Sequence, residues 1–517
     1  MGDPRSVGAV SALQRVRQLF GRVPDHPWVV LALVVGGVVA LRAPGAGGLA
    51  YPDEGGLLLV ADQLHDGPQL YGRLFVDRPP GLVAVYAVGN LLGGIEAVRW
   101  IGIVLVVVLV GAASLLGRLV GSRQAGIWTG IAAAALACNP LLGTRSINAE
   151  LVGAPLTVLG VLVTVAAVRR PPGWSRALLL VLAGLLGSAA LMVKQNLADT
   201  VVFGTVLLAV LGLTRAWPAR QVLTAYAWAA LGLAVPWLVT AAWVVIDGPG
   251  LRVLWDTLYA FRVTASAVIA DQDASAPTRR LLTLPFLGLV SGLLMIVGVG
   301  SWRLRRRLAA RDPVVVAGLA MLAAEVAGVL LGGSYWSHYL VGLLPGAVLW
   351  MALLVNGPRG RVRVLVATVG VALGSTLVSS AVAVIPATPG DRSDEAALVA
   401  WLDSAARPGD TGAVTWGHPQ LLEASGLLPR SPLIWSLPQR TLDPDLHRFK
   451  KMLSGRRAPT WVLVWNPVDS WDLDVGGKAT LTLIAHYRFI RYVCDVGVYV
   501  RRDVVRVLPP MPTRCVD

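Results

Sequence analysis

Long apolar runs separated by short polar connections dominate the first 386 residues of the chain. A helix that crosses a membrane needs roughly 20 apolar residues. The runs that approach or reach this length are residues 28–45, 97–118, 123–143, 150–168, 176–193, 198–213, 221–246, 281–302, 313–333, 339–355 and 363–386. The pattern predicts a polytopic α-helical membrane protein with about eleven spans.

The short apolar segment at residues 80–95 decides the topology, because every later connection changes side if this segment crosses the membrane. Arginine and lysine concentrate in the cytoplasmic connections of membrane proteins. If residues 80–95 do not cross and the N-terminus is cytoplasmic, the cytoplasmic connections hold 19 Arg or Lys, about twice the number in the outer connections up to residue 338. If the segment crosses, the arginine-rich stretch 303–311 faces outward. We therefore expect an interfacial helix at 80–95 and a C-terminus outside the cell.

The remaining residues, 387–517, alternate short apolar stretches with Gly- and Pro-rich turns and predict a separate α/β domain. Residues 394–406 have helical periodicity. The expected strands are residues 412–416, 460–465 and 492–502. About 130 residues are enough to bury a small core.

Three parts follow from this division: a cytoplasmic segment 1–27, a membrane module 28–386 with its first outer loop at 46–96, and an extracytoplasmic domain 387–517. Composition agrees, since the 517 residues are 55% hydrophobic and 15% charged, with a mean hydropathy of +0.65. The net charge is +15, but the arginines lie at the ends of apolar runs, so we expect membrane lipids and no nucleic acid as partners. The first apolar run lacks a cleavage site and resembles a retained signal anchor.

Charged residues gather at one predicted membrane face, in the first outer connection and at the outer ends of later spans. They are Asp53, Glu54, Asp77, Arg78, Glu150, Lys194 and His338. Ionisable residues near a membrane core are costly and usually mark a functional site. Carboxylates that face cations at the rim of a helix bundle suit an anionic substrate and a proton that must be removed.

Five motifs, in chain order, resemble the GT-C glycosyltransferases that use polyprenyl-phosphate sugars, such as the lipid A aminoarabinose transferases and the protein O-mannosyltransferases. The likeness covers roughly residues 28–350 and rests on YPDE, DRPPG, Glu150 in the second outer loop, the Met-x-Lys segment ending at Lys194, and SHYLVGLLP. The chain departs from the family pattern at Arg78, where lysine is common, and at Glu150, where aspartate is common. Both departures bear on donor choice and metal dependence.

The resemblance implies a hexosyl- or pentosyltransferase of a bacterial cytoplasmic membrane, with its site on the outer face. The sugar would pass from a polyprenyl phosphate to a glycan, lipid or protein acceptor, with inversion at the anomeric carbon. Asp53 is the expected base, since a sugar hydroxyl needs a carboxylate to take its proton. The leaving phosphate would meet Arg78, Lys194 and His338, because fixed cations stabilise its growing charge.

Glu54 and Glu150 would orient the acceptor. Alternatively, Asp53 and Glu150 would bind a divalent cation. Oxygen ligands favour Mg²⁺ or Mn²⁺. Each residue also has a purely structural interpretation. Asp53 suits a helix N-cap, Arg78 a snorkelling side chain, Glu150 and Lys194 an ion pair with each other, and His338 an interfacial histidine. The role of Glu325, inside a predicted span, is left open.

Two other functions fit the same pattern. A lipid-linked sugar transporter or flippase would also need intramembrane charge and a basic headgroup site, although no inverted repeat is visible and the charges lie at one face. A non-catalytic assembly protein could use the outer domain to bind cell-envelope glycan. Detection of sugar transfer by purified protein separates these classes.

The cysteines Cys494 and Cys515 both fall in the outer domain under this topology. An oxidising compartment favours disulfides, so we expect these two residues to be joined. The alternative is that Cys515, close to residue 517, has a free thiol. Cys138 lies in an apolar run.

We predict that reporter fusions after residues 175, 310 and 360 report a cytoplasmic location and that a fusion after residue 517 reports an outer one. The arginine asymmetry is the reason. A reporter that is active outside the cytoplasm at residue 310, or a cytoplasmic signal at residue 517, would overturn the topology.

Overall fold

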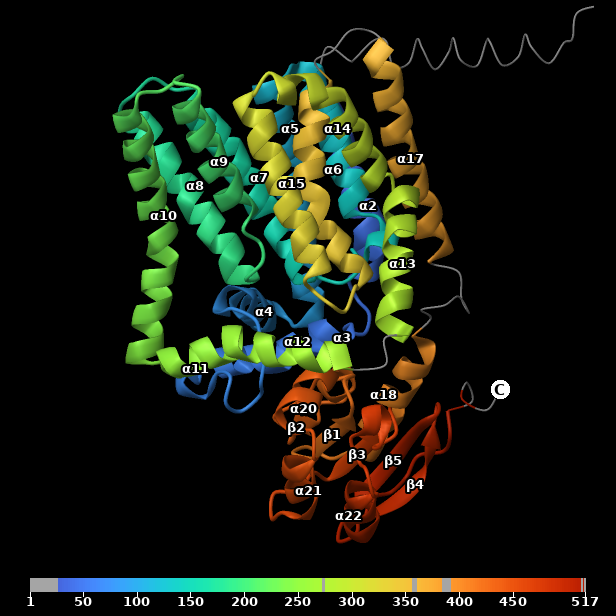
Figure 1. The fold of residues 1–517 in the computed structure, drawn as a ribbon. Coiled ribbons are helices and arrows are strands. Elements are labelled where there is room, and N and C mark those ends of the chain that lie inside the picture. Colours follow the sequence, from blue (N-terminus) through green and yellow to red (C-terminus); the bar gives the residue numbers. More distant parts are fainter. Residues whose placement is uncertain (1–26, 272–274, 356–359, 384–391, 513–514, 516–517) are drawn as a thin grey trace, which may run out of the picture.

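The computed structural model describes residues 27–271, 275–355, 360–383, 392–512 and 515. The expected cytoplasmic segment 1–27 lies outside this range except for its last residue. A helical bundle occupies one part of the molecule and a small domain with a sheet the other, with a layer of short helices between them (Figure 1). The two larger parts correspond to the membrane module and the C-terminal domain expected from the sequence.

Helices that run along the bundle make up most of the membrane module (Figure 1). They are α2 (Pro27–Arg42), α5 (Ile95–Val120), α6 (Arg123–Ala137), α7 (Ala149–Val168), α8 (Trp174–Val193), α9 (Asp199–Leu213), α10 (Ala219–Ile246), α13 (Ser275–Val290), α14 (Leu293–Ala309), α15 (Pro313–Leu330), α16 (Leu344–Leu354) and α17 (Gly360–Val382). Among the described residues, eight helices are long and apolar enough to cross a membrane, or nine if the bent pair of α13 and α14 is one span.

This count includes the segment Leu251–Asp271, which the sequence pattern did not predict as a span, whereas two of the eleven expected runs form shorter helices. The runs 123–143 and 198–213 fold into α6 and α9, each of 15 residues. The run 363–386 lies in α17, a helix of 23 residues that contains the apolar stretch Ala367–Val382. A helix of 15 residues is about 22 Å long, which is less than a hydrocarbon core of about 30 Å. The run 123–143 has the length of a span because it includes apolar residues beyond Ala137, whereas the run 198–213 has only 16 residues.

The run 281–302, expected as one straight span, is broken. Helices α13 and α14 meet at an angle of 72°. Gly292 separates them with φ +82°, a left-handed conformation that residues with a side chain rarely adopt. A Cβ at this position would lie 3.0 Å from the backbone nitrogen of Ala372, so α17 also packs closely against the break.

A layer of shorter helices covers the end of the bundle that faces the C-terminal domain (Figure 1). It contains α3 (Pro52–Ala61), α4 (Pro80–Leu92), α11 (Leu251–Trp255), the π-helical turn Asp256–Ala260 and α12 (Phe261–Asp271). Helix α4 falls within residues 80–95, where an interfacial helix was expected, and Gly81 lets it approach α8, since a Cβ there would lie 2.6 Å from the carbonyl oxygen of Met192. The segment Leu251–Asp271 is apolar enough to span, yet it lies across the bundle end.

The C-terminal domain has a five-stranded sheet in the order β2-β1-β3-β5-β4. Its strands are β1 (Thr411–Thr415), β2 (Leu428–Pro429), β3 (Trp461–Val464), β4 (Tyr487–Val493) and β5 (Val496–Arg501), and its helices are α18 (Ser393–Ala405), α19 (Gln420–Ala424), α20 (Ser436–Leu442), α21 (His447–Ser454) and α22 (Lys478–His486). Strands β2, β1 and β3 are parallel, and β5 and β4 are antiparallel. The fully buried Trp461 anchors one of its apolar clusters.

The single strand expected at 492–502 instead contains the end of β4, a turn and all of β5, which together form a hairpin. Cys494 and Asp495 have φ values of +46° and +63°, and two successive residues with positive φ are typical of the tight turns that join antiparallel strands. The apolar residues on both sides of this turn concealed it in the sequence. Cys494 forms a disulfide with Cys515, 21 positions further along the chain.

We predict that Cys494→Ser lowers the thermal unfolding midpoint of the C-terminal domain by several degrees. A closed loop of this length contributes about 3 kcal/mol in chain-entropy treatments. The control is a reductant, which should reproduce the loss in the wild-type protein and leave the variant unchanged. Labelling of both Cys494 and Cys515 in unfolded, non-reduced protein would contradict the bond.

Candidate functional site at the end of the helix bundle

The first part of the site is a carboxylate between two arginines, just before α4. Asp77 Oδ1 is 2.8 Å from Arg78 Nη1, and Asp77 Oδ2 is 2.6 Å from Arg262 Nη2. Burial raises the pKa of Asp77, but the two guanidinium groups more than offset burial and hold this pKa below its ordinary value. Two cations on one carboxylate leave a net positive charge, which suits an anionic ligand.

The backbone around this trio is also fixed by hydrogen bonds. The Tyr71 hydroxyl donates to the carbonyl oxygen of Arg78 at 3.0 Å, and the Gln195 amide donates to that of Asp77 at 3.0 Å. The backbone at Asp77 and Arg78 is therefore fixed by two hydrogen bonds. The Arg78 side chain is 23% exposed. It is paired and partly buried, unlike the snorkelling arginine that was the structural alternative.

The second part of the site is the buried pair of Glu150 and Lys194. Asn148 caps α7, because its side chain accepts a hydrogen bond from the nitrogen of Leu151, and this places Glu150 in the first turn. Lys194 ends α8 and donates to Glu150. Its Nζ also lies 4.7 Å from the centroid of the Tyr339 ring, a cation–π contact. The structural interpretation of these two residues, an ion pair, is thus present in the fold.

Asp53 and Glu54 are neighbours with different surroundings. Glu54 is fully buried, and its carboxylate accepts from Tyr51 N at 2.9 Å, Arg99 Nη2 at 3.0 Å and Ile147 N at 2.7 Å. Glu54, and not Asp53, therefore satisfies the free backbone nitrogen at the start of α3. Asp53 is exposed. It interacts electrostatically with Arg78 and His338.

The structure thus brings Asp53, Asp77, Arg78, Glu150, Lys194 and His338 together and places Glu54 apart, within the packed bundle end. His338 belongs to the 3-10 helix Ser337–Leu343, and its ring is 5.0 Å from that of Tyr339. It also interacts electrostatically with Glu150. All of these residues lie at one end of the bundle, as the sequence pattern suggested.

Sequence reasoning missed Arg262. The residue lies in α12, within the apolar segment Leu251–Asp271, and an arginine inside such a segment is itself a signal of function. The π-helical turn immediately before α12 is a second signal in the structure, since such turns are frequent at functional sites. The segment was overlooked because it was not assigned to a span.

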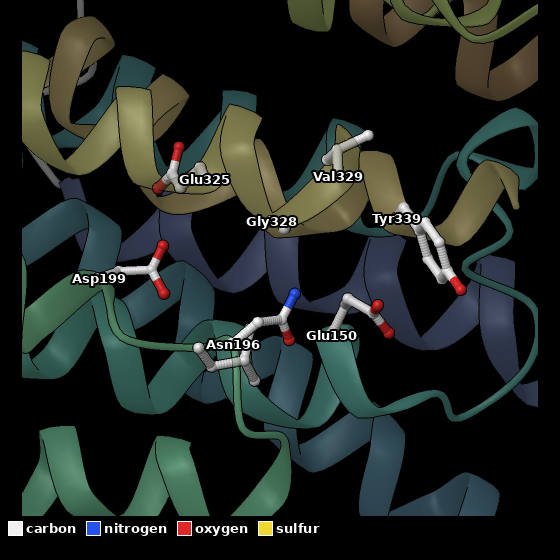
Figure 2. Close-up of a pocket in the computed structure, with 9 residues that line it drawn as sticks. Glu150, Asn196, Asp199, Glu325, Gly328, Val329 and Tyr339 are labelled. Carbon is white, nitrogen blue, oxygen red and sulfur yellow. The ribbon is translucent and has the colours of Figure 1, made fainter. Parts of the chain in front are cut away.

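A narrow cavity continues from this site into the bundle. Figure 2 shows Glu150 and Tyr339 at one end and Asp199 and Glu325 at the other. The cavity leaves a volume of about 10 Å³ in which the centre of a water-sized sphere can lie. This is room for about one water molecule. Glu325 accepts from the backbone nitrogen of Gly346 at 2.8 Å near the start of α16, so this buried carboxyl holds a helix end.

The two residues expected to bind a divalent cation are Asp53 and Glu150. Among the described residues, no three His, Cys, Asp or Glu side chains are grouped so that they could hold a metal ion. Glu150 is also already paired with a cation, Lys194.

The C-terminal domain contacts the segment that carries Asp53. Arg392, at the start of α18, donates to the carbonyl oxygens of Leu49 and Ala50 at 2.9 and 2.7 Å. Its guanidinium lies 4.9 Å from the centroid of the Tyr51 ring. Tyr51, immediately before α3, thus contacts a residue of the C-terminal domain. Because α3 carries Asp53, the domain helps to position the expected base.

Comparison with solved structures shows a GT-C fold. ArnT from Cupriavidus metallidurans bound to undecaprenyl phosphate has a TM-score of 0.62 at 14% identity over 92% of this chain and 98% of that chain. The same protein in the apo state has a TM-score of 0.62 at 16% identity over 91% and 97%.

The archaeal oligosaccharyltransferase AglB from Archaeoglobus fulgidus, in complex with an inhibitory peptide and a dolichol-phosphate, has a TM-score of 0.51 at 13% identity over 94% of this chain and 76% of that chain. No family model and no curated protein matches the chain. At these identities the likeness establishes the fold alone.

We predict that Glu54→Gln lowers the thermal unfolding midpoint of the detergent-solubilised protein. Removing one partner of a buried ion pair costs about 3–5 kcal/mol, and Arg99 would lose its carboxylate. The matched control is Glu96→Gln, an exposed first-turn acid of α5, which should leave the midpoint unchanged. Loss of activity with an unchanged midpoint would assign Glu54 to the chemistry instead of the fold.

Proposed function

We propose that this chain, which has the GT-C fold, transfers a sugar from a polyprenyl-phosphate donor to an acceptor hydroxyl of the cell envelope. The observation that carries this proposal is the exposed carboxylate of Asp53 within electrostatic range of Arg78, whose partner Asp77 also binds Arg262. ArnT, which shares the fold, is described bound to undecaprenyl phosphate. A lipid donor suits a site at the end of a bundle, because its tail can remain in the bilayer.

The phosphate of the donor would bind at the net positive trio of Asp77, Arg78 and Arg262. A phosphodiester carries one negative charge, and charge-assisted hydrogen bonds from guanidinium groups are strong and directional. Lys194 lies on the other side of the site, held by Glu150 against Tyr339. With His338 it would contact the same phosphate as negative charge develops on the leaving oxygen.

Asp53 would take the proton of the acceptor during sugar transfer. The acceptor oxygen attacks the anomeric carbon as the bond to the phosphate oxygen breaks, so the configuration inverts in a single displacement. Asp53 suits this role because it is exposed to an incoming acceptor. Glu54 and Glu150 are already held by Arg99 and Lys194. Glu150 would act by orienting Lys194 and the acceptor.

We place the reaction on the outer face of a bacterial cytoplasmic membrane, because the arginine asymmetry puts the N-terminus and the arginine-rich connections in the cytoplasm. The acceptor would be a glycan, a glycolipid or a protein, and the sugar a hexose or pentose. The site lies at one end of the bundle (Figure 1), whereas transporters bind substrate near the middle of the membrane. This placement favours transfer over transport.

We predict that Asp53→Asn reduces turnover about 10²–10⁴-fold, the usual contribution of a general base, without weakening donor binding. Arg78→Ala should instead weaken donor binding, because a charge-assisted phosphate contact is lost. Both are measured with purified protein and a radiolabelled polyprenyl-phosphate sugar, by sugar transfer and by donor binding. The matched control is Asp66→Asn in the same outer loop, which should behave as wild type.

Folded Asp53→Asn protein with wild-type turnover would show that Asp53 is not the base, and Glu150 would be tested next. Wild-type protein that binds the labelled donor and moves it across a vesicle membrane without transferring the sugar would contradict the glycosyltransferase assignment as a whole.

A further inference from the structure

A second cavity lies at the other end of the bundle from the site. It runs between α2, α5 and α6 and has a volume of about 300 Å³. Its lining is apolar along most of its length, with Leu31, Val34, Leu115, Ile127 and Ile131 among the contributors. Helix α5 begins beside α4 and runs 26 residues away from it, about 39 Å at 1.5 Å per residue. The cavity borders the last part of that run.

The cavity is an open groove because glycines of α5 and α6 contribute to its lining. A Cβ at Gly111 would meet nothing within 4 Å, so the groove is open at that point. At Gly126 a Cβ would lie 2.4 Å from Cγ of Arg118, so the aliphatic part of that arginine lies directly over α6. Trp28 and Leu115, on the rim, are 68% and 50% exposed. An apolar rim in a membrane helix faces lipid, so an acyl chain can enter from the side.

Two arginines lie where the groove reaches the membrane surface. Arg118 belongs to the last turn of α5, and Arg123 is the first residue of α6; both side chains are exposed and line the groove. An apolar slot that ends at two guanidinium groups is complementary to a lipid with an anionic headgroup.

We propose that the groove between α2, α5 and α6 binds an anionic glycerophospholipid, with an acyl chain along the helices and its phosphate at Arg118 and Arg123. This ligand is distinct from the sugar donor, because the groove opens at the membrane face farther from the C-terminal domain. Basic clusters beside membrane helices bind anionic headgroups through the same electrostatics. The site would hold α2 against α5 and α6.

The test is native mass spectrometry of the full-length protein with phosphatidylglycerol and with phosphatidylcholine of the same acyl chains. We expect selective retention of phosphatidylglycerol, which also raises the thermal unfolding midpoint. The double variant Arg118→Gln with Arg123→Gln should weaken this binding about 30-fold. Gly111→Leu should weaken it by filling the groove where a side chain meets no other atom. The control is Arg220→Gln, an exposed arginine at the start of α10 outside the groove.

Equal retention of the two lipids would overturn the headgroup assignment. Unchanged phosphatidylglycerol binding in folded Gly111→Leu protein would overturn the groove as the acyl site. An equal loss in Arg220→Gln would show that surface charge alone attracts the lipid. Sugar transfer by the double variant is measured alongside, so a failure of this site is distinguished from a failure of the proposed activity.

Discussion

The buried carboxylate of Glu54 is the interaction on which the bundle end depends. Its oxygens accept hydrogen bonds from Tyr51 N just before α3, from Arg99 of α5 and from the chain before α7. Arg99 in turn donates to the carbonyl oxygens of Gly45, Gly48 and Leu49. A buried charge is tolerated only when it is paired and hydrogen-bonded. This network therefore fixes three separate stretches of chain at once, and with them the start of α3.

Pairing divides the carboxylates at this end of the bundle into two groups. Glu54, Asp77 and Glu150 each face at least one cation, so their charge serves mainly to position arginine or lysine. Asp53 is exposed and lies one residue from the fixed Glu54. The chain thereby holds a solvent-accessible carboxylate on a rigid support, which is the arrangement that general-base chemistry requires.

Contact between the C-terminal domain and α3 depends on two glycines. A Cβ at Gly55 would lie 2.4 Å from Cα of Gln420, and a Cβ at Gly56 would lie 2.2 Å from the ring of Trp435. Any larger residue would separate α3 from the domain. With Arg392 on the preceding residues, this close packing makes the domain part of the support for the site.

Sequence alone determined the membrane module, the C-terminal α/β domain and the gathering of charged residues at one face, because apolar runs and their charged ends are local signals. It could not identify Arg262, since an apolar helix of about 20 residues can span or lie across a bundle, and only packing decides between them. The break at Gly292 and the hairpin at Cys494 were hidden inside apolar stretches for the same reason. Tertiary structure also decided which of two adjacent acids, Asp53 or Glu54, is buried, because that depends on where Arg99 and Ile147 come to lie.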